Sequence, residues 1–166
     1  MKFDIGCDLN EFKKYRDQAI GYGGEDEIYW VKENPSHLIV LREENRIIGH
    51  AIWHPSNSRE HQPGDSREEE DTRLIEELLG GKGDFVELHE LWLTKENRGK
   101  GYGNKLLDFF EQFIKSKGHN SVIFYAYNPA AISLCQKREY KGIFGYESTG
   151  VEGKMETMYI FHISLE

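Results

Sequence analysis

The apolar positions of the chain recur with two periods, one typical of strands and one typical of helices. Apolar runs at 38–41 and 47–53, separated by a polar turn at 43–45, predict a β-hairpin. A run over 84–94 predicts a strand, and the apolar residues that follow residue 102 are spaced as in an amphipathic helix. Further strands are predicted at 1–6, 121–127 and 155–165, and further helices at 8–20, 25–34, about 66–79 and 129–139.

One segment, 55–71, interrupts this alternation because it is polar, charged and without periodicity. We expect a surface loop that runs into a helix near Ser66, either as a solvated insertion or as a lid over an acceptor site. The order of elements predicts an α/β (α+β) fold in which helices flank a mixed sheet. A chain of 166 residues fits a single domain, 1–166.

Composition and charge narrow the range of partners. Acidic residues outnumber basic ones 29 to 21, and the formal charge of -8 argues against nucleic-acid binding, which needs surplus Lys and Arg. An amine or another cationic partner fits better.

Cys7 and Cys135 match no zinc spacing and no disulfide framework, and the chain has no run of 18 apolar residues. We therefore predict a cytoplasmic monomer or homodimer without a membrane partner. The histidines show no metal-ligand spacing, so no metal is expected.

The stretch RGKGYG, residues 98–103, places three glycines and two basic residues between a predicted strand and a predicted helix. Glycines leave backbone NH groups open to a phosphate, a helix start favours an anion, and Arg98 and Lys100 add positive charge. The P-loop pattern GxxxxGK followed by Ser or Thr is missing. A dinucleotide fingerprint is also excluded, because Asn104 and Leu106 stand where its last glycine is required.

With this loop the sequence resembles the GCN5-related N-acetyltransferase (GNAT) superfamily, whose acyl-CoA loop follows the pattern Q/R-x-x-G-x-G/A. A second segment, 128–140, resembles the family pattern N-P-x-A-x-x-L-Y-x-x-x-G-F/Y, and the likeness extends over about 85–161. Its matching positions are Asn128, Pro129, Ala131, Leu134 and Tyr140. The resemblance implies a mostly antiparallel sheet of six to seven strands, flanked by helices, with a splayed parallel strand pair at the acyl-CoA site.

The resemblance also implies which residues hold acetyl-CoA, the cosubstrate. The pantetheine would pair with the strand backbone at Leu91 and Leu93, and the Asn128 side chain would contact the cofactor from a neighbouring strand end. The pyrophosphate would rest on the backbone NH groups of the loop, formed by Arg98, Gly99, Lys100, Gly101, Tyr102, Gly103 and Asn104.

Transfer to an amine needs a proton acceptor, because an ammonium must become neutral before it attacks. Glu87 stands eleven residues before Arg98, the spacing at which the resemblance implies a catalytic glutamate. Glu90 is the alternative base, and it points to the other side of a regular strand. His89 is an alternative proton relay.

The resemblance implies a tyrosine as the acid that protonates the leaving CoA thiolate, but this chain has Cys135 at that position. Three interpretations stay open: Cys135 as a substitute acid, Tyr140 or Tyr127 reaching the thiolate, or no dedicated acid. Glu139 is a second departure, because it occupies a family glycine position.

The sequence therefore predicts an acetyl-CoA-dependent N-acetyltransferase that acts on a primary amine of a small molecule or peptide. The alternative is a catalytically weak acyl-CoA-binding module or sensor, which Cys135 favours and Glu87 opposes.

Overall fold

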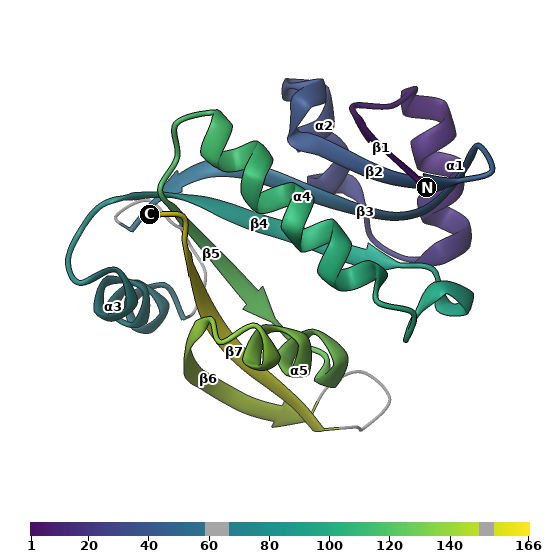
Figure 1. Cartoon of the computed structure of the whole chain (residues 1–166). Coiled ribbons are helices and arrows are strands. Elements are labelled where there is room, and N and C mark those ends of the chain that lie inside the picture. The colour runs from purple at the N-terminus through teal and green to yellow at the C-terminus, as the bar shows by residue number, and fades with distance from the viewer. Residues whose placement is uncertain (59–66, 150–154) are drawn as a thin grey trace. The chain divides into compact units, whose positions relative to one another are not determined.

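A computed structural model of the chain describes residues 1–58, 67–149 and 155–166. The described residues form seven strands, five α-helices and two short 3-10 helices (Figure 1). In chain order they are β1 (Lys2–Ile5), α1 (Leu9–Ala19), α2 (Glu25–Glu33), η1 (Pro35–His37), β2 (Leu38–Glu43), β3 (Arg46–Asn57), α3 (Glu68–Leu79), β4 (Asp84–Leu93), η2 (Lys95–Asn97), α4 (Tyr102–Ser116), β5 (Ser121–Ala126), α5 (Pro129–Lys137), β6 (Lys141–Thr149) and β7 (Met155–Ser164).

The strands form one mixed sheet in the order β1-β2-β3-β4-β5-β7-β6. β4 and β5 form a parallel pair, and the pairs β1-β2, β2-β3, β5-β7 and β6-β7 are antiparallel. The predicted fold class, a mostly antiparallel sheet of six to seven strands flanked by helices, is confirmed.

The chain divides into two compact units. Unit 1 consists of residues 1–54 and 88–116, and unit 2 of residues 55–87 and 117–166. β4 contributes its first four residues to unit 2 and its last six to unit 1. The single domain over 1–166 stays a prediction.

In unit 1, helices cover both faces of the strands (Figure 1). α1 and α2 bury one face in a cluster of Phe12, Tyr15, Val31, Leu38, Val40, Ile47 and Ile52. α4 covers the other face, and its Phe109 stacks on Phe3 of β1 with 4.4 Å between the ring centroids. The hairpin turn between β2 and β3 has Glu44 and Asn45 at positive φ (52° and 65°), as a type I′ turn requires.

In unit 2, α3 packs on the strands through a cluster that includes Leu74, Ile75, Leu78, Ile123 and Ile160. The sequence predicts no strand between 129–139 and 155–165, but residues 141–149 form β6, which pairs with β7. Gly142 and Gly145 allow β6 to approach β7 closely, because a Cβ at these positions would lie 2.5 Å from the side chains of Phe161 and Met158, respectively.

The polar segment 55–71 differs in part from its prediction. Residues 55–57 extend β3, and the following helix begins at Glu68. Most of the expected loop and the expected helix start at Ser66 lie outside the described residues. The solvated insertion and the lid therefore both stay predictions.

Candidate active site

The glycine loop joins the end of β4 to the start of α4 in unit 1. Gly99 and Gly101 have φ of 76° and 84°, the left-handed region that glycine adopts at little cost. A Cβ at either position would have no heavy atom within 4 Å, so both glycines border open space. The first NH groups of α4 lack partners within the helix, and its dipole favours an anion there. The loop therefore has the conformation and exposure that a phosphate cradle requires.

Side chains anchor this loop on both sides. Arg98 donates from Nε to the Leu93 carbonyl oxygen at 3.0 Å, and its guanidinium lies 4.7 Å from the Trp92 ring centroid. Tyr102 donates its hydroxyl to Glu43 Oε2 at 2.5 Å, and this bond raises the pKa of the phenol. Lys100 is exposed beside the two left-handed glycines. Arg98 thus fixes the end of β4, and Lys100 supplies exposed positive charge.

The strand that precedes the loop is tightly packed on β3. A Cβ on Gly49 would lie 2.6 Å from Leu93 Cδ2 and 2.9 Å from the Trp92 carbonyl oxygen. Leu91 and Leu93 are both partly buried. Unit 1 therefore contains Leu91, Leu93 and the whole predicted loop 98–104.

A buried polar network lies under the same strand, and sequence reasoning did not find it. Arg16 of α1 donates to both carboxylate oxygens of Glu90, from Nε at 3.1 Å and from Nη2 at 2.8 Å. His50 Nε2 lies 2.7 Å from Glu90 Oε1, and His50 Nδ1 lies 2.8 Å from the Tyr15 hydroxyl. Arg16 and His50 are buried, and α1, β3 and β4 each contribute a member.

This network determines what Glu90 can do. Burial alone would raise the pKa of Glu90, but the hydrogen bonds and charges of His50 and Arg16 outweigh it and lower the pKa to about 2. Burial, followed by the Glu90 charge, raises the pKa of Tyr15. A carboxylate held so firmly in its charged form is a weak proton acceptor near neutral pH. Of the two candidate bases, Glu90 is therefore the less suitable.

A cavity of about 360 Å³ adjoins the network within unit 1. Its lining includes Arg16, Glu27, Glu90 and Trp92, together with the loop 22–24 before α2. Glu27 Oε1 lies 3.7 Å from Arg16 Nη2 and 3.5 Å from His89 Nε2, and the bond to His89 lowers the Glu27 pKa. His89, the alternative relay, is therefore paired with a carboxylate of this cavity.

The other predicted site residues lie in unit 2. Glu87 lies on β4 and is 5% exposed. Its charge contributes to the raised pKa of Tyr127, the residue that follows β5. Partial burial, then the charges of Tyr146, Asp71 and Glu87, raise the pKa of Tyr127, so its phenol stays protonated at neutral pH. Asn128 is the N-cap of α5, with its side-chain oxygen accepting from the Ala131 NH at 2.8 Å.

The candidate acids differ in their surroundings. Cys135 is fully buried, and burial raises the pKa of its thiol to about 12. Tyr140 is partly buried, and its hydroxyl accepts a hydrogen bond from Arg138 Nε at 2.6 Å. Glu139 between them has φ of 60°, the conformation in which the family pattern has glycine. These observations favour Tyr140 over Cys135 as a proton donor.

The fold and the exposed glycine loop indicate an acyl-CoA-dependent transferase. The model of the acetyltransferase (GNAT) family matches residues 8–140, and the chain therefore belongs to this family. No curated protein sequence matches the chain. No helix among the described residues is both long enough and apolar enough to cross a bilayer.

Several solved structures are similar to the chain. Agmatine N-acetyltransferase (mutant S171A, apo form) has a TM-score of 0.72 at 14% identity, covering 98% of both chains. Polyamine N-acetyltransferase of Drosophila melanogaster has a TM-score of 0.68 at 13% identity, covering 98% of this chain and 100% of that one. The Salmonella typhimurium protein yncA, solved with acetyl-CoA, has a TM-score of 0.67 at 14% identity, covering 99% and 94%. At these identities the likeness concerns the fold.

Proposed function

We propose that the protein transfers the acetyl group of acetyl-CoA to a primary amine by direct attack. The observation that carries the proposal is the exposed loop with left-handed Gly99 and Gly101 between β4 and α4, in a chain of the GNAT family. Arg98, Lys100 and the NH groups up to Asn104 would hold the pyrophosphate. The backbone of Leu91 and Leu93 would hold the pantetheine, with Asn128 as a further contact.

The reaction would proceed by addition and elimination. The acceptor, which starts as an ammonium, first loses one proton. The nitrogen of the neutral amine then forms a bond to the thioester carbon, and backbone NH groups near Leu91–Leu93 stabilise the oxyanion. The C–S bond then breaks and the nitrogen loses its second proton. This proton either goes to the CoA thiolate or restores a protein acid that has protonated the thiolate. The products are an N-acetylamine, CoA thiol and one released proton.

We assign the first proton to Glu87, because the carboxylate of Glu90 is already held by Arg16 and His50. We assign the thiolate proton to Tyr140. The fully buried Cys135 is the second candidate acid, and transfer without a dedicated acid is the third. The cytoplasmic location and the absence of a metal stay predictions.

Two measurements test the transferase. Acetyl-CoA at millimolar concentration should raise the melting temperature, because it binds the folded chain. Thiol release from acetyl-CoA should then appear with some members of a panel of alkylamines, polyamines, amino acids and peptides. A melting shift without thiol release would instead favour the acyl-CoA-binding module.

The role of Glu87 has a matched control on its own strand. Glu87→Gln should lower kcat by about 10²-fold or more between pH 6 and 9, the usual contribution of a general base. Asp84→Asn, which removes an exposed carboxylate from the start of β4, should keep the rate. Equal rates in both variants would exclude Glu87 as the base.

A further inference from the structure

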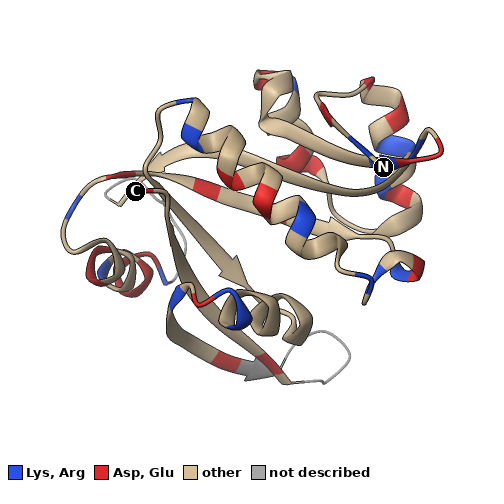
Figure 2. Cartoon of the chain, in the orientation of Figure 1, with Lys and Arg blue, Asp and Glu red and all other residues tan. Residues whose placement is uncertain are grey.

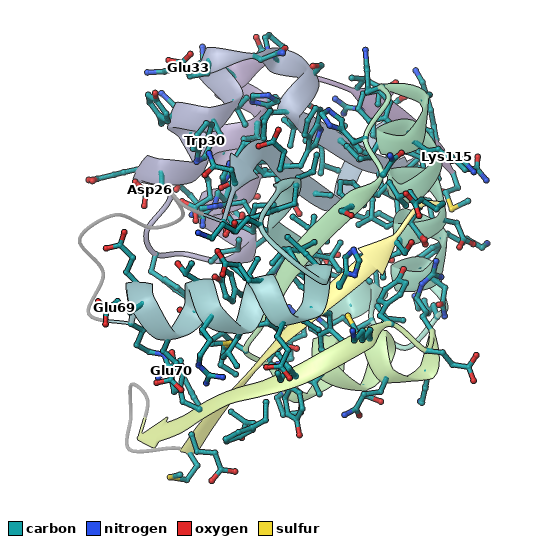
Figure 3. All side chains as sticks on the ribbon, turned by 90° about the vertical axis from the view of Figure 1, so that its left-hand side faces the viewer. Asp26, Trp30, Glu33, Glu69, Glu70 and Lys115 are labelled. Carbon is teal, nitrogen blue, oxygen red and sulfur yellow. The ribbon has the colours of Figure 1, made fainter. Side chains whose placement is uncertain are left out.

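A carboxylate from another part of unit 1 contacts the glycine loop. Glu43, the last residue of β2, accepts a hydrogen bond of 2.5 Å from the hydroxyl of Tyr102. Figure 2 shows acidic residues in the turn between β2 and β3, and basic residues in the segment between β4 and α4. Acidic side chains such as Glu33 of α2 and Glu69 of α3 are instead exposed on the surfaces of their helices (Figure 3). Glu43 is partly buried, and it is bound to the loop that would hold the pyrophosphate.

This contact adds no attraction for an anion. Arg98 and Lys100 give the loop positive charge, and the charge of Glu43 opposes them. A phenol has a single proton, so the Tyr102 hydroxyl that donates to Glu43 does not donate to a phosphate at the same time. If the contact supports phosphate binding, it does so by fixing the conformation of the loop.

Glu43 is a fixed acceptor, because the residue before it ties down the same turn. Arg42 donates to Asp4 Oδ2 at 2.9 Å and to both carboxylate oxygens of Glu11 at 2.8 Å. It also donates to the Asn45 carbonyl oxygen in the turn at 3.3 Å. Arg42 contacts α1 and Glu43 contacts α4, so these successive side chains lie on opposite faces of the sheet, as in a regular strand.

The loop needs such an anchor because it is rich in glycine. Glycine loses more conformational freedom than any other residue when it is ordered, and a bound pyrophosphate has to order this loop. Tyr102 stands between Gly101 and Gly103, so its hydrogen bond restrains the glycine run from within. Lys105 Nζ lies 5.7 Å from the Tyr102 ring centroid, and the Lys105 NH donates to the Gly101 carbonyl oxygen at 3.3 Å. A hydrogen bond to a carboxylate is also stronger than one between neutral groups.

We propose that Glu43 and Tyr102 form a clamp that pre-organises the glycine loop for the pyrophosphate of acetyl-CoA. Both are positioning residues, and the inference rests on the proposed function because it takes the loop to be the pyrophosphate site. The clamp acts before the cofactor arrives, by reducing the conformational entropy that binding has to remove. Its loss therefore weakens cofactor binding and leaves the chemical step unchanged, so KM for acetyl-CoA rises while kcat stays the same.

The test is a calorimetric titration with CoA. Tyr102→Phe and Glu43→Ala should each raise the Kd about three- to tenfold. The double variant should bind CoA no more weakly than either single variant, because both remove the same contact. If Tyr102 were instead a direct phosphate ligand, Glu43→Ala would bind CoA more tightly than the intact chain, and this result would overturn the clamp.

A conservative variant separates the hydrogen bond from the charge. Glu43→Gln keeps an acceptor oxygen and removes the negative charge, so it should bind CoA more tightly than Glu43→Ala. Equal Kd values for these two variants would overturn the clamp. Glu44→Ala is the matched control, because it removes an exposed carboxylate from the next position of the same turn. Its Kd should stay within about twofold of that of the intact chain.

A measurement without cofactor shows whether the contact orders the loop or merely stabilises the fold. In the CoA-free chain, the NMR order parameters of the Gly101 and Gly103 amides should fall from about 0.85 to below about 0.6 in Tyr102→Phe. A purely stabilising contact would lower the melting temperature and leave these order parameters unchanged. Unchanged order parameters would overturn the clamp.

The same experiments separate the clamp from the transferase. If the intact chain and the Tyr102 and Glu43 variants bind CoA with equal Kd values, the clamp is refuted and acetyl transfer stands. If the intact chain does not bind CoA, acetyl transfer is refuted, and the role of the clamp in cofactor binding is refuted with it. With an amine that supports thiol release, the KM for acetyl-CoA in each clamp variant should rise by the same factor as the Kd, with kcat within about twofold.

Discussion

Removing the charge of Glu90 should expose how strongly the buried network holds unit 1 together. Glu90→Gln keeps the size of the side chain but leaves the buried guanidinium of Arg16 without its closest carboxylate. The folded pKa of Glu90 is about 2 against an ordinary value of 4.5. At about 1.4 kcal/mol per unit, this difference corresponds to about 3 kcal/mol of stability at pH 7.

The pH dependence of this loss has a definite sign. Because folding lowers the pKa of Glu90, its carboxylate contributes fully to the free energy of unfolding above about pH 4.5. This contribution is lost as the pH falls through about 2. Urea unfolding should therefore show wild type about 3 kcal/mol more stable than Glu90→Gln at pH 7, and only about 1 kcal/mol more stable at pH 3.

Glu11 supplies the matched control. Its pKa is also lowered to about 2, mainly by the Arg42 hydrogen bond, but its side chain is 43% exposed. Solvent screening should limit the cost of Glu11→Gln to about 1 kcal/mol or less. A cost of Glu90→Gln no larger than that of Glu11→Gln, or one that stayed constant from pH 7 to pH 3, would refute this role of the network.

Three further variants test other parts of the account. Glu139→Gly should stabilise the chain by about 1 kcal/mol in urea unfolding, because glycine relieves the left-handed φ of 60°; a loss of stability would contradict this. Gly101→Ala should weaken CoA binding at least about tenfold in calorimetry, whereas Gly118→Ala, with a comparable φ of 90° and open surroundings, should not. Cys135→Ala should cost about 1–2 kcal/mol of stability, since the thiol is fully buried, and leave kcat within about threefold. A larger fall in kcat would restore Cys135 as the acid.

The sequence predicted the fold well where periodicity and turn chemistry agreed. The amphipathic pattern of α4 and the apolar run of β4 are unambiguous, so periodicity alone locates the loop between them. No strand is predicted at β6, where Gly142 and Gly145 interrupt the alternation of apolar and polar residues. Their role depends on Phe161 and Met158, which lie on another strand.

The site was predictable only where a local motif carries it. RGKGYG is contiguous, and its glycines have the backbone freedom expected of a phosphate loop. The buried network, in contrast, joins Arg16 to Glu90, 74 positions further along the chain, and no spacing rule connects them. The one available signal was the place of Arg16 on the buried side of α1, where a charged residue needs a partner.

The central claim is that the chain moves an acetyl group from CoA to an amine. Its most direct test is to incubate the chain with acetyl-CoA labelled with carbon-13 in the acetyl group and a mixture of mono- and diamines, and to analyse the products by mass spectrometry. A labelled N-acetylamine should form in equal amount with CoA thiol. Binding of acetyl-CoA with no labelled amine above the enzyme-free reaction would contradict the claim.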